Sequence, residues 1–523
     1  SIKDASKYMS RSAGGHIHIG VAGNCKATRE VLDNRDTLVQ ILDIIVGNTC
    51  VLIDSDKGNI ERRKVYRETS KGVTENGAVT LTRSGSPLLD FFAQAGAMRG
   101  NKDGALDLFK KAFSEDREKA IRILFYLRDI RGGQGERDLF RVCLEWIGSN
   151  YQDVFEQIIN YIPEYGRWDD MFFDNARCFS FMLEQLEHDR SADSPSLLAK
   201  WLPTINASSD KTRAKAKFFA GKFDLNDKAY RIAVRDIRKK IATVEEKMSA
   251  RKWGDINYSS IPSQASRIYK NAFKKHDEKR YTSFIEKAIS GEVKINTSTL
   301  YPYQVYKDVG SMTAEALWKQ LPDYTQGKNA LVVADVSGSM HGDPIAVSVS
   351  LALYFAERNV GQFKDYFMTF SSEPVLQKIV GKTLLEKTNS IARSKWDMTT
   401  NIQAVFDVLL GTAIKNSTPP AELPETIYII SDMEFDMACT YHTNLETIAR
   451  KYEGSGYKIP NLVFWNVRAS GKNLPADKNE RGISLVSGFS PSIFKLAVEN
   501  KTPEETMTSV IESDRYSIIT ITK

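Results

Sequence analysis

The stretch ALVVADVSGS, residues 330–339, marks a change of architecture in this chain of 523 residues. It begins with five apolar residues and continues into the polar loop Asp335-Val336-Ser337-Gly338-Ser339. A short, continuous apolar run followed by a polar loop is typical of a buried strand. A helix-like segment, 344–357, follows with Pro344 in its first turn. This order predicts the first strand–loop–helix unit of an α/β sheet.

Two further apolar runs, 426–430 and 462–465, are predicted strands with helical segments between them. The alternation indicates βαβ units around a mostly parallel, doubly wound sheet. From Leu88 to about Leu321 the apolar residues instead recur at helical spacing, with short breakers between segments. This pattern favours an α-solenoid of HEAT-like helix pairs and leaves open whether the pairs close into a ring.

The chain is too long for one hydrophobic core, because domains usually stop growing at roughly 250 to 300 residues. We therefore predict a multidomain α and α/β protein. Its parts are an N-terminal segment 1–74, a helical domain 75–325 and an α/β domain 326–523. The breaker RGGQGER, 131–137, has two interpretations: a phosphate clasp built on Arg131 and Arg137, or a glycine-rich turn between two helices.

Composition limits the class of protein further. With 42% hydrophobic residues and no apolar run near the ~18 residues that cross a bilayer, we expect a soluble globular protein without a membrane span. Five cysteines without a CxxC pair argue against a disulfide framework or a zinc cluster and favour a reducing, cytoplasmic location. The chain begins at Ser1 without a signal-peptide pattern, so we interpret its start as a cut or processed end.

Oxygen-bearing side chains follow the predicted strands at their carboxyl ends, where open α/β sheets bind ligands. Asp335, Ser337 and Ser339 alternate along one tight loop, Thr400 precedes a helical run, and Asp432 follows the strand 426–430. Oxygen ligands suit a hard divalent cation, above all Mg²⁺. The alternative is a polar turn with a capping serine, and the neighbouring Thr399 is a second candidate for the threonine position. No nucleophile and base accompany these residues, so we expect binding without catalysis.

This D-x-S-x-S, then T, then D arrangement resembles the metal-ion-dependent adhesion site (MIDAS) of von Willebrand factor A domains. The resemblance implies that Ser337 and Ser339 bind the ion directly. It also implies that Asp335 and Asp432 hold it directly or through water. Thr400 then approaches when a carboxylate of a protein partner completes the coordination sphere.

Four motifs of the helical part carry a second resemblance: RDIRGGQGERDLF (128–140), YGRWDDMF (165–172), KWLP (200–203) and KWGDINYSSIPSQASRIYKNAFKKHDEKRY (252–281). They look like an uncharacterised family of viruses, bacteria and plants that is related to the Ro autoantigen. The TROVE module of Ro proteins is a ring of HEAT-like helices joined to a von Willebrand factor A domain. The resemblance runs from about Glu75 to the C-terminus. It implies a ribonucleoprotein that binds small structured RNAs or single-stranded RNA ends.

The distribution of charge points the same way. The net charge is +6, yet residues 206–280 hold 20 Lys and Arg against nine Asp and Glu. Residues 327–523 hold 20 against 22. Such a basic segment can neutralise phosphates, and Tyr258 or Tyr269 could stack on unpaired bases. The alternative is an ordinary solvated helix face with buried tyrosines. The candidate RNA contacts are Lys211, Arg213, Lys215, Lys217, Arg231, Arg235, Arg238, Lys239, Arg267, Lys274 and Lys275.

The N-terminal segment contains Gly14-Gly15-His16-Ile17-His18-Ile19-Gly20, which places His16 and His18 on one face of a predicted strand. This stretch resembles the GGHIH element of phage-type amidoligases with the glutamine-synthetase fold. The acidic strands that such a ligase needs are missing, so we interpret the segment as a remnant. Three functions compete: an RNA-binding protein, a metal-dependent protein-interaction scaffold without RNA, and a fragment of an ATP-dependent carboxylate-amine ligase.

Overall fold

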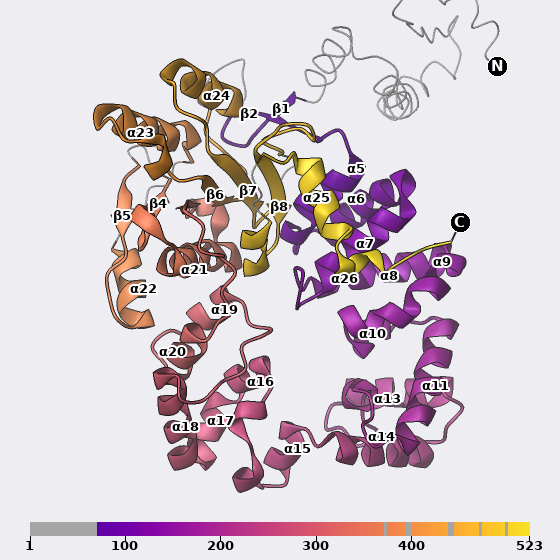
Figure 1. The fold of residues 1–523 in the computed structure, drawn as a ribbon. Coiled ribbons are helices and arrows are strands. Elements are labelled where there is room, and N and C mark those ends of the chain that lie inside the picture. Colours follow the sequence, from indigo (N-terminus) through magenta and orange to yellow (C-terminus); the bar gives the residue numbers. More distant parts are fainter. Residues whose placement is uncertain are drawn as a thin grey trace, which may run out of the picture. The chain divides into compact units, whose positions relative to one another are not determined.

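The computed structural model describes residues 71–370, 374–393, 400–437, 444–469, 473–496 and 500–522. Gly72–Lys523 form one compact unit, in which a series of helices precedes a mixed β-sheet (Figure 1). A two-stranded sheet of β1 (Lys71–Val73) and β2 (Val79–Leu81) comes before the helices. The predicted strand with His16 and His18 lies outside the described residues.

The predicted helical character of residues 88–321 is confirmed. Its helices are α5 (Pro87–Gln94), α6 (Lys102–Glu115), α7 (Arg117–Arg128), α8 (Arg137–Asn150), α9 (Gln152–Ile158), α10 (Ile162–Tyr165), α11 (Ala176–Ser191), α12 (Leu198–Trp201), α13 (Asp210–Lys222), α14 (Asp227–Ile241), α15 (Val244–Ser249), α16 (Ser263–Ile268), α17 (Lys270–His276), α18 (Glu278–Ser290), α19 (Pro302–Tyr306) and α20 (Met312–Lys319).

Side-chain caps fix where many of these helices begin. The side chain of Ser86 accepts a hydrogen bond from the amide of Leu89 at the start of α5, and Asp116 does the same for Lys119 at the start of α7. Asn226 caps α14 in the same way. Each cap satisfies an amide that has no partner within the helix. The breaks between helices are therefore encoded locally.

The RGGQGER segment is a turn between α7 and α8. A Cβ atom on Gly133 would lie 1.8 Å from the carbonyl oxygen of Tyr126, so only glycine fits there. Gln134 is buried and donates to the Tyr126 hydroxyl at 2.6 Å. Glu136 is also buried and accepts from the Arg99 guanidinium. These contacts support the interpretation as a structural turn.

The predicted α/β architecture of the C-terminal part is confirmed in its strands and helices. Among the described residues, six strands lie in the order β5-β4-β3-β6-β7-β8, and β5 alone of these is antiparallel to its neighbour. The elements are β3 (Ala330–Ala334), α21 (Asp343–Arg358), β4 (Tyr366–Thr369), β5 (Leu376–Lys378), α22 (Leu384–Ala392), α23 (Ile402–Lys415), β6 (Thr426–Ser431), α24 (Asn444–Ser455), β7 (Asn461–Asn466), β8 (Ile483–Ser487), α25 (Pro503–Ile511) and α26 (Asp514–Ser517).

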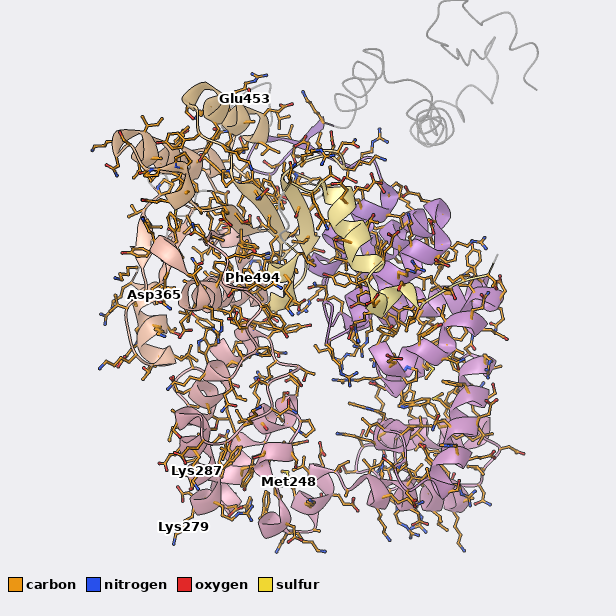
Figure 2. All side chains as sticks on the ribbon, viewed as in Figure 1. Met248, Lys279, Lys287, Asp365, Glu453 and Phe494 are labelled. Carbon is orange, nitrogen blue, oxygen red and sulfur yellow. The ribbon has the colours of Figure 1, made fainter. Side chains whose placement is uncertain are left out.

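Strands β3 and β6 are buried along their whole length, as parallel strands covered on both faces should be. Phe494 lies at the centre of an aromatic cluster that packs against the sheet, and Figure 2 marks its position. Its ring centroid is 4.8 Å from Phe355, 4.9 Å from Tyr428 and 5.0 Å from Trp465. This packing holds α21 and the central strands in one core, and so fixes the strand ends that carry the candidate site.

Both ends of the helical segment pack against the α/β part. At one end α5 contacts β8, while α25 and α26 contact α7. At the other end α19 contacts α21, α20 contacts α22, and the Trp318 indole donates to Glu357 at 2.7 Å. The helical segment therefore contacts the α/β part near both of its ends.

Candidate functional site

Asp335 and Asp432 lie at the carboxyl ends of two neighbouring parallel strands. The register pairs Ala334 of β3 with Ile430 of β6, so the residues that follow each strand meet. The Ser431 hydroxyl donates to Oδ2 of Asp335 at 2.7 Å and joins the two loops. Both aspartates are buried. The pairing of β3 with β6 thus brings together two carboxylates that are almost a hundred residues apart.

The loop after β3 holds its own polar atoms close together. The amide of Ser337 donates to Oδ1 of Asp335 at 2.8 Å, and the hydroxyls of Ser337 and Ser339 are 3.1 Å apart. Arg468, which follows β7, donates to the carbonyl oxygen of Ser339. We call Asp335, Ser337, Ser339 and Asp432 the strand-end site.

Electrostatics at the strand-end site favour a cation. Burial, together with the nearby Asp432 carboxylate, raises the pKa of Asp335 to about 6. Oδ1 of Asp432 accepts from the amide of Glu434 at 3.2 Å, while its buried Oδ2 has no hydrogen-bond partner in the described residues. A buried carboxylate oxygen without a partner is costly unless a bound ion or water satisfies it.

The donor set is chemically suited to a hard divalent ion. It consists of carboxylate and hydroxyl oxygens. The described residues contain no cluster of three or more His, Cys, Asp or Glu side chains that could hold a metal, so a site here would depend on the two hydroxyls as well as on the two carboxylates. Oxygen ligands with few charges are typical of Mg²⁺ sites, in which water or a partner supplies the rest. Asp335, Ser337, Ser339 and Asp432 could therefore hold such an ion.

Thr400 lies on a neighbouring loop and its hydroxyl is engaged within the protein. It donates to the carbonyl oxygen of Glu434 at 2.9 Å and accepts from Nδ2 of Asn76 at 3.0 Å. Its amide donates to Asp436 at 2.8 Å. The structure thus places Thr400 against the loop that carries Asp432, two to four residues further along. No hydrogen bond joins it to the loop 335–339 in the described part of the chain.

The sequence did not reveal the residues that hold this loop. Residues 74–77 between β1 and β2, which we call the strap, run along this loop. The amide of Glu75 donates to the carboxylate of Glu434 at 2.7 Å, and the side chain of Asn76 donates to the backbone carbonyl of Glu434 at 2.7 Å. The other carboxylate oxygen of Glu434 accepts from Asn473 at 2.7 Å. The acidic pattern SDMEFD, 431–436, is the signal that could have drawn attention to Ser431 and Glu434.

The candidate RNA contacts lie on three helices, α13, α14 and α17, and at the end of α16. Seven of them, Lys211, Lys215, Lys217, Arg231, Lys239, Lys274 and Lys275, are exposed, and their side chains form no hydrogen bond or ion pair among the described residues. On α14 the buried side chains are Tyr230, Ala233, Val234 and Ile237, so Arg231, Arg235 and Lys239 share the opposite, exposed face.

The other candidate cations are engaged within the protein. Arg238 turns inward and donates to the carbonyl oxygen of Ala199 at 2.7 Å, at the end of α12. Arg267 pairs with Asp308 at 2.9 Å, and Arg235 pairs with Asp236 at 2.9 Å. Arg213 forms an ion pair with Asp210 and donates to the carbonyl of Ser208 at 2.9 Å. Helical spacing places Arg238 on the same side of α14 as Arg231 and Lys239, yet its side chain turns inward, so it does not belong to their exposed row.

One aromatic ring is exposed among the lysines of α13. Phe218 is 44% exposed and packs edge-on against Phe179, with centroids 5.7 Å apart. Lys211, Lys215 and Lys222 precede or follow it at helical spacing. Lys222 lies 5.2 Å from its ring, and the Lys215 ammonium lies 5.1 Å from the ring of Phe172, where burial lowers the pKa of Lys215. Sequence reasoning missed Phe218, because an FF pair within a helix predicts core packing.

The aromatic residues proposed from the sequence have structural roles. Tyr258 is buried, and its hydroxyl donates to Asp277 at 2.8 Å. Tyr269 is half-buried and its hydroxyl donates to Glu245 at 3.2 Å. Trp168 is also buried and stacks on Phe181, so it packs in the core of the helical part. A base-stacking platform on either tyrosine would need these contacts to open.

None of the helices in the described part of the chain has the length and apolar character needed to cross a membrane. Cys143 and Cys178 are free and buried, and burial raises the pKa of the Cys178 thiol to about 12.

Comparisons with known proteins divide the chain at the same place as its architecture. A family model described as "Domain of unknown function (DUF2828)" matches residues 74–153 and 156–335, and one described as "Domain of unknown function (DUF7788)" matches residues 329–519. An uncharacterized protein of Acanthamoeba polyphaga mimivirus is 28% identical, and the match covers 84% of this chain and 87% of the viral protein. Among solved structures, the Deinococcus radiodurans Ro (RSR) protein matches at 11% identity and a TM-score of 0.30, over 80% of this chain and 92% of that chain.

Proposed function

We propose that this protein binds single-stranded RNA, or the unpaired ends of structured RNA, on the exposed cations of α13 and α14. The observation that carries the proposal is the set Lys211, Lys217, Arg231 and Lys239, which we call the α13–α14 basic surface. These side chains are exposed and form no ion pair or hydrogen bond in the described residues, although acidic and carbonyl partners engage most arginines around them. Cations without protein partners can meet phosphates at little cost.

The exposed ring of Phe218 supports unpaired RNA as the ligand. A base can stack on this ring while neighbouring lysines of α13 contact its phosphates, and stacking needs a base that has left a duplex. The motif resemblance to the Ro-related family also supports the proposal. So does the order of a helical module followed by an α/β domain. We therefore place the protein in the Ro/TROVE class of ribonucleoproteins as a proposal, with a HEAT-like ring as its helical module. The buried free thiols support a reducing, cytoplasmic setting.

A direct test uses the triple variant Lys211→Glu, Arg231→Glu, Lys239→Glu and a fluorescent single-stranded RNA of about 20 nucleotides. We expect the affinity to fall by at least about tenfold, because the variant loses cations that neutralise phosphates. Each lost phosphate contact should also lower the slope of log affinity against log salt concentration by about 0.7. The matched control is Lys364→Glu, Lys415→Glu, Lys458→Glu, which reverses three exposed lysines of the α/β part. Equal losses in both triple variants would contradict the α13–α14 placement.

Phe218→Ala separates stacking from charge. We expect the affinity for unpaired RNA to fall about fivefold or more, since one base–aromatic stack is worth about 1–3 kcal/mol, and the salt dependence to stay the same. Leu197→Ala, which shortens another exposed apolar side chain, is the control. An unchanged affinity in Phe218→Ala would remove the ring from the proposed site.

We further infer that the strand-end site binds Mg²⁺ in the manner of a MIDAS, within a von Willebrand factor A-type domain, and that the ion takes a carboxylate from a protein partner. Two neighbouring buried carboxylates, of which Asp432 has one oxygen without a hydrogen-bond partner in the described residues, support this inference. When bound, the ion would neutralise both carboxylates and offer an open position to a ligand oxygen. Asp335, Ser337, Ser339 and Asp432 would hold it, and Thr400 would approach from its own loop.

The metal proposal is tested by the melting temperature in Mg²⁺ and in chelator. A ligand that binds only the folded state stabilises it by RT ln(1 + [L]/Kd), so Mg²⁺ should raise the melting temperature of the wild-type protein. Asp335→Asn and Asp432→Asn should remove the increment. Glu434→Gln is the matched control, because both oxygens of this buried carboxylate already have protein donors. A Mg²⁺ increment that survives in both asparagine variants would contradict the site.

The second candidate function is a metal-dependent protein-interaction scaffold that binds no RNA, and the unpartnered oxygen of Asp432 favours it. Purification from cells with and without ribonuclease separates the two. Co-purifying RNA that the charge-reversal variant lacks supports RNA binding, whereas a protein that leaves the complex on chelation supports the scaffold. His16 and His18, on which the ligase alternative rests, lie outside the described residues.

A further inference from the structure

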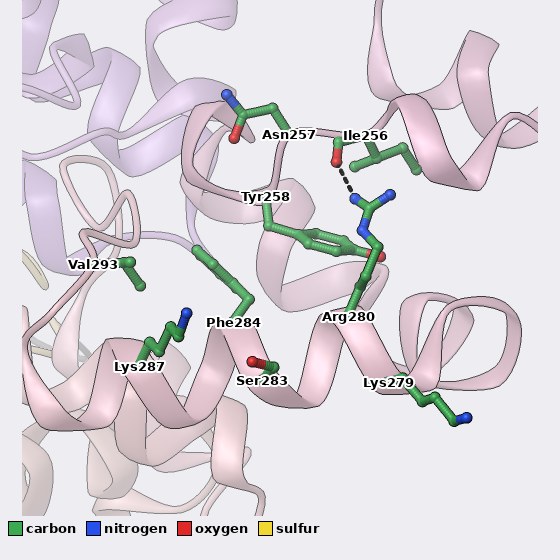
Figure 3. A pocket seen from close by; sticks show the side chains of 9 residues that line it. All are labelled: Ile256, Asn257, Tyr258, Lys279, Arg280, Ser283, Phe284, Lys287 and Val293. Carbon is green, nitrogen blue, oxygen red and sulfur yellow. Dashed lines mark hydrogen bonds between the residues drawn. The ribbon is translucent and has the colours of Figure 1, made fainter.

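A pocket of about 480 Å³ lies between α18, the loop Ile256–Tyr258 and Val293, away from both sites described above (Figure 3). Its walls come from α18 on one side and from the short loop on the other. Pockets of roughly 300–1,000 Å³ are typical of small-molecule sites. This pocket is therefore large enough for one nucleotide or a molecule of similar size.

The loop wall is rigid because several contacts tie it to α18. The Arg280 guanidinium donates to the carbonyl oxygens of Gly254 and Ile256, the latter at 2.6 Å, and lies 5.4 Å from the ring centroid of Tyr258. The Tyr258 hydroxyl is fixed by its bond to Asp277. The guanidinium of Arg280 thus donates its hydrogen bonds to backbone carbonyls and holds the loop wall in place. It is not available to a ligand.

The aromatic part of the pocket is preformed. The rings of Tyr258 and Phe284 lie 5.5 Å apart with an interplanar angle of 33°, and Tyr258 is also in contact with Phe273 and Tyr281. Phe284 is half-buried, so one part of its ring faces the pocket beside Val293 (Figure 3). A flat apolar group that enters the pocket would meet the ring of Phe284.

Polar groups stand next to this ring at helical spacing. Lys279, Ser283 and Lys287 follow one another every four residues, so they form one exposed row on α18. In the part of the chain that the structure describes, the lining contains three cations and no carboxylate. The Lys287 side chain extends toward Phe284 and Val293, whereas Lys279 extends away from the pocket (Figure 3). Lys287 and Ser283 are thus the donors that a bound anion could reach together.

We propose that this pocket binds a nucleoside monophosphate, with the phosphate on Lys287 and Ser283 and the base against Phe284. An anion alone would leave the aromatic wall unused, and a neutral apolar molecule would leave the lysine and hydroxyl unpaired. A nucleotide combines a planar ring and a phosphate in one molecule of suitable size. Two sources supply this chemistry: a free nucleotide and the 5′-phosphorylated end of an RNA strand.

The test measures binding of adenosine monophosphate to the full chain by calorimetry, beside adenosine and inorganic phosphate as separate probes. The monophosphate should bind at least about tenfold more tightly than either part, since a hydrogen bond to a charged group contributes about 1.5–3 kcal/mol, equivalent to roughly a tenfold or larger change. The absence of saturable binding at millimolar nucleotide would overturn the proposal.

Three variants place the nucleotide in the pocket. Lys287→Met keeps the apolar stem of the side chain and should weaken the binding of adenosine monophosphate by about tenfold or more. Phe284→Leu should weaken it by about fivefold or more through the lost stack. The matched control is Lys279→Met, about two turns along the same row, whose side chain extends away from the pocket; it should change the affinity less than about twofold. Equal losses in Lys287→Met and Lys279→Met would show a diffuse charge effect and overturn the site.

Competition between the two sources completes the test. A 5′-phosphorylated hexanucleotide that displaces adenosine monophosphate, while its unphosphorylated form does not, assigns the pocket to RNA ends. Displacement by neither form assigns it to free nucleotides, and equal displacement by both forms contradicts a monophosphate site. The α13–α14 charge-reversal variant keeps the pocket intact, so failure of the proposed function and failure of this inference are distinguishable.

Discussion

The first and second halves of the helical segment carry the same kinds of cation in different surroundings. Arg128 in α7 is buried and pairs with buried Asp170 at 2.7 Å, and Arg141 in α8 contacts the same carboxylate at 2.8 Å. Arg231 and Lys239 in α14 are exposed and have no partner among the described residues. A buried charge must be paired to be tolerated, whereas an exposed one is free to bind a ligand. Partners and burial, more than the number of cations, thus separate a structural arginine from a candidate RNA contact.

The largest effect should come from breaking the buried pair. Asp170→Ala leaves the guanidinium groups of Arg128 and Arg141 without their shared acceptor and should lower the free energy of unfolding by about 3–5 kcal/mol. Denaturant unfolding measures this. Asp236→Ala, which removes the exposed partner of Arg235, should leave the unfolding midpoint unchanged. Similar unfolding midpoints for both variants would contradict the difference between buried, paired charges in the first half and exposed charges in the second half.

The next effect concerns the docking of the first half on the sheet. The amide of Gly96 donates to Oγ of Ser487 at 3.0 Å, and a Cβ atom on Gly96 would lie 2.8 Å from the carbonyl oxygen of Ser487 in β8. Gly96→Ala should therefore cost about 1–3 kcal/mol through backbone shifts. Gly100→Ala, where a Cβ atom meets nothing within 4 Å, is the control. Equal melting temperatures for the two variants would show that the close contact between Gly96 and Ser487 does not contribute to stability.

Arg238 and its neighbour Lys239 sharpen the comparison within one helix. Arg238→Met removes the donor to the Ala199 carbonyl and should lower stability by about 1.5 kcal/mol, with little change in RNA affinity. Lys239→Met should leave the melting temperature unchanged and lower both RNA affinity and its salt slope, the latter by about 0.7. Thermal melting and RNA titration of both variants give the answer. Exchanged outcomes would reverse the assignments of the two side chains.

The smallest effect is a pH dependence in the first half. Burial, followed by weaker contributions that include repulsion from Glu115, raises the pKa of Asp90 to about 6. The folded protein then binds a proton that the unfolded chain releases, so this residue makes folding more favourable as the pH falls from 7 through 6. Asp90→Asn should flatten that part of the stability curve and raise stability at pH 7. A curve parallel to that of the wild-type protein would exclude ionised Asp90 as the cause.

Local pattern was sufficient for most elements of the fold. The run 330–334, the helix that begins near Pro344, and the strands 426–430 and 462–465 all form where the apolar pattern predicts them. Helix periodicity failed at Arg238, because spacing places it on the exposed face while an acceptor 39 residues away draws it inward. The RGGQGER turn was ambiguous for a related reason, since Gln134 and Glu136 find their partners on distant segments.

The sequence by itself determined the strand ends that carry Asp335 and Asp432, the concentration of positive charge in residues 206–280, and the boundary between helices and sheet. These follow from hydrophobic period and residue chemistry within short windows. Only the tertiary structure decided which cations are paired, how the strap reaches Thr400 across 324 residues, and that Phe284, Ser283 and Lys287 border one pocket. Such contacts depend on where distant segments pack, and no local pattern in the sequence encodes that placement.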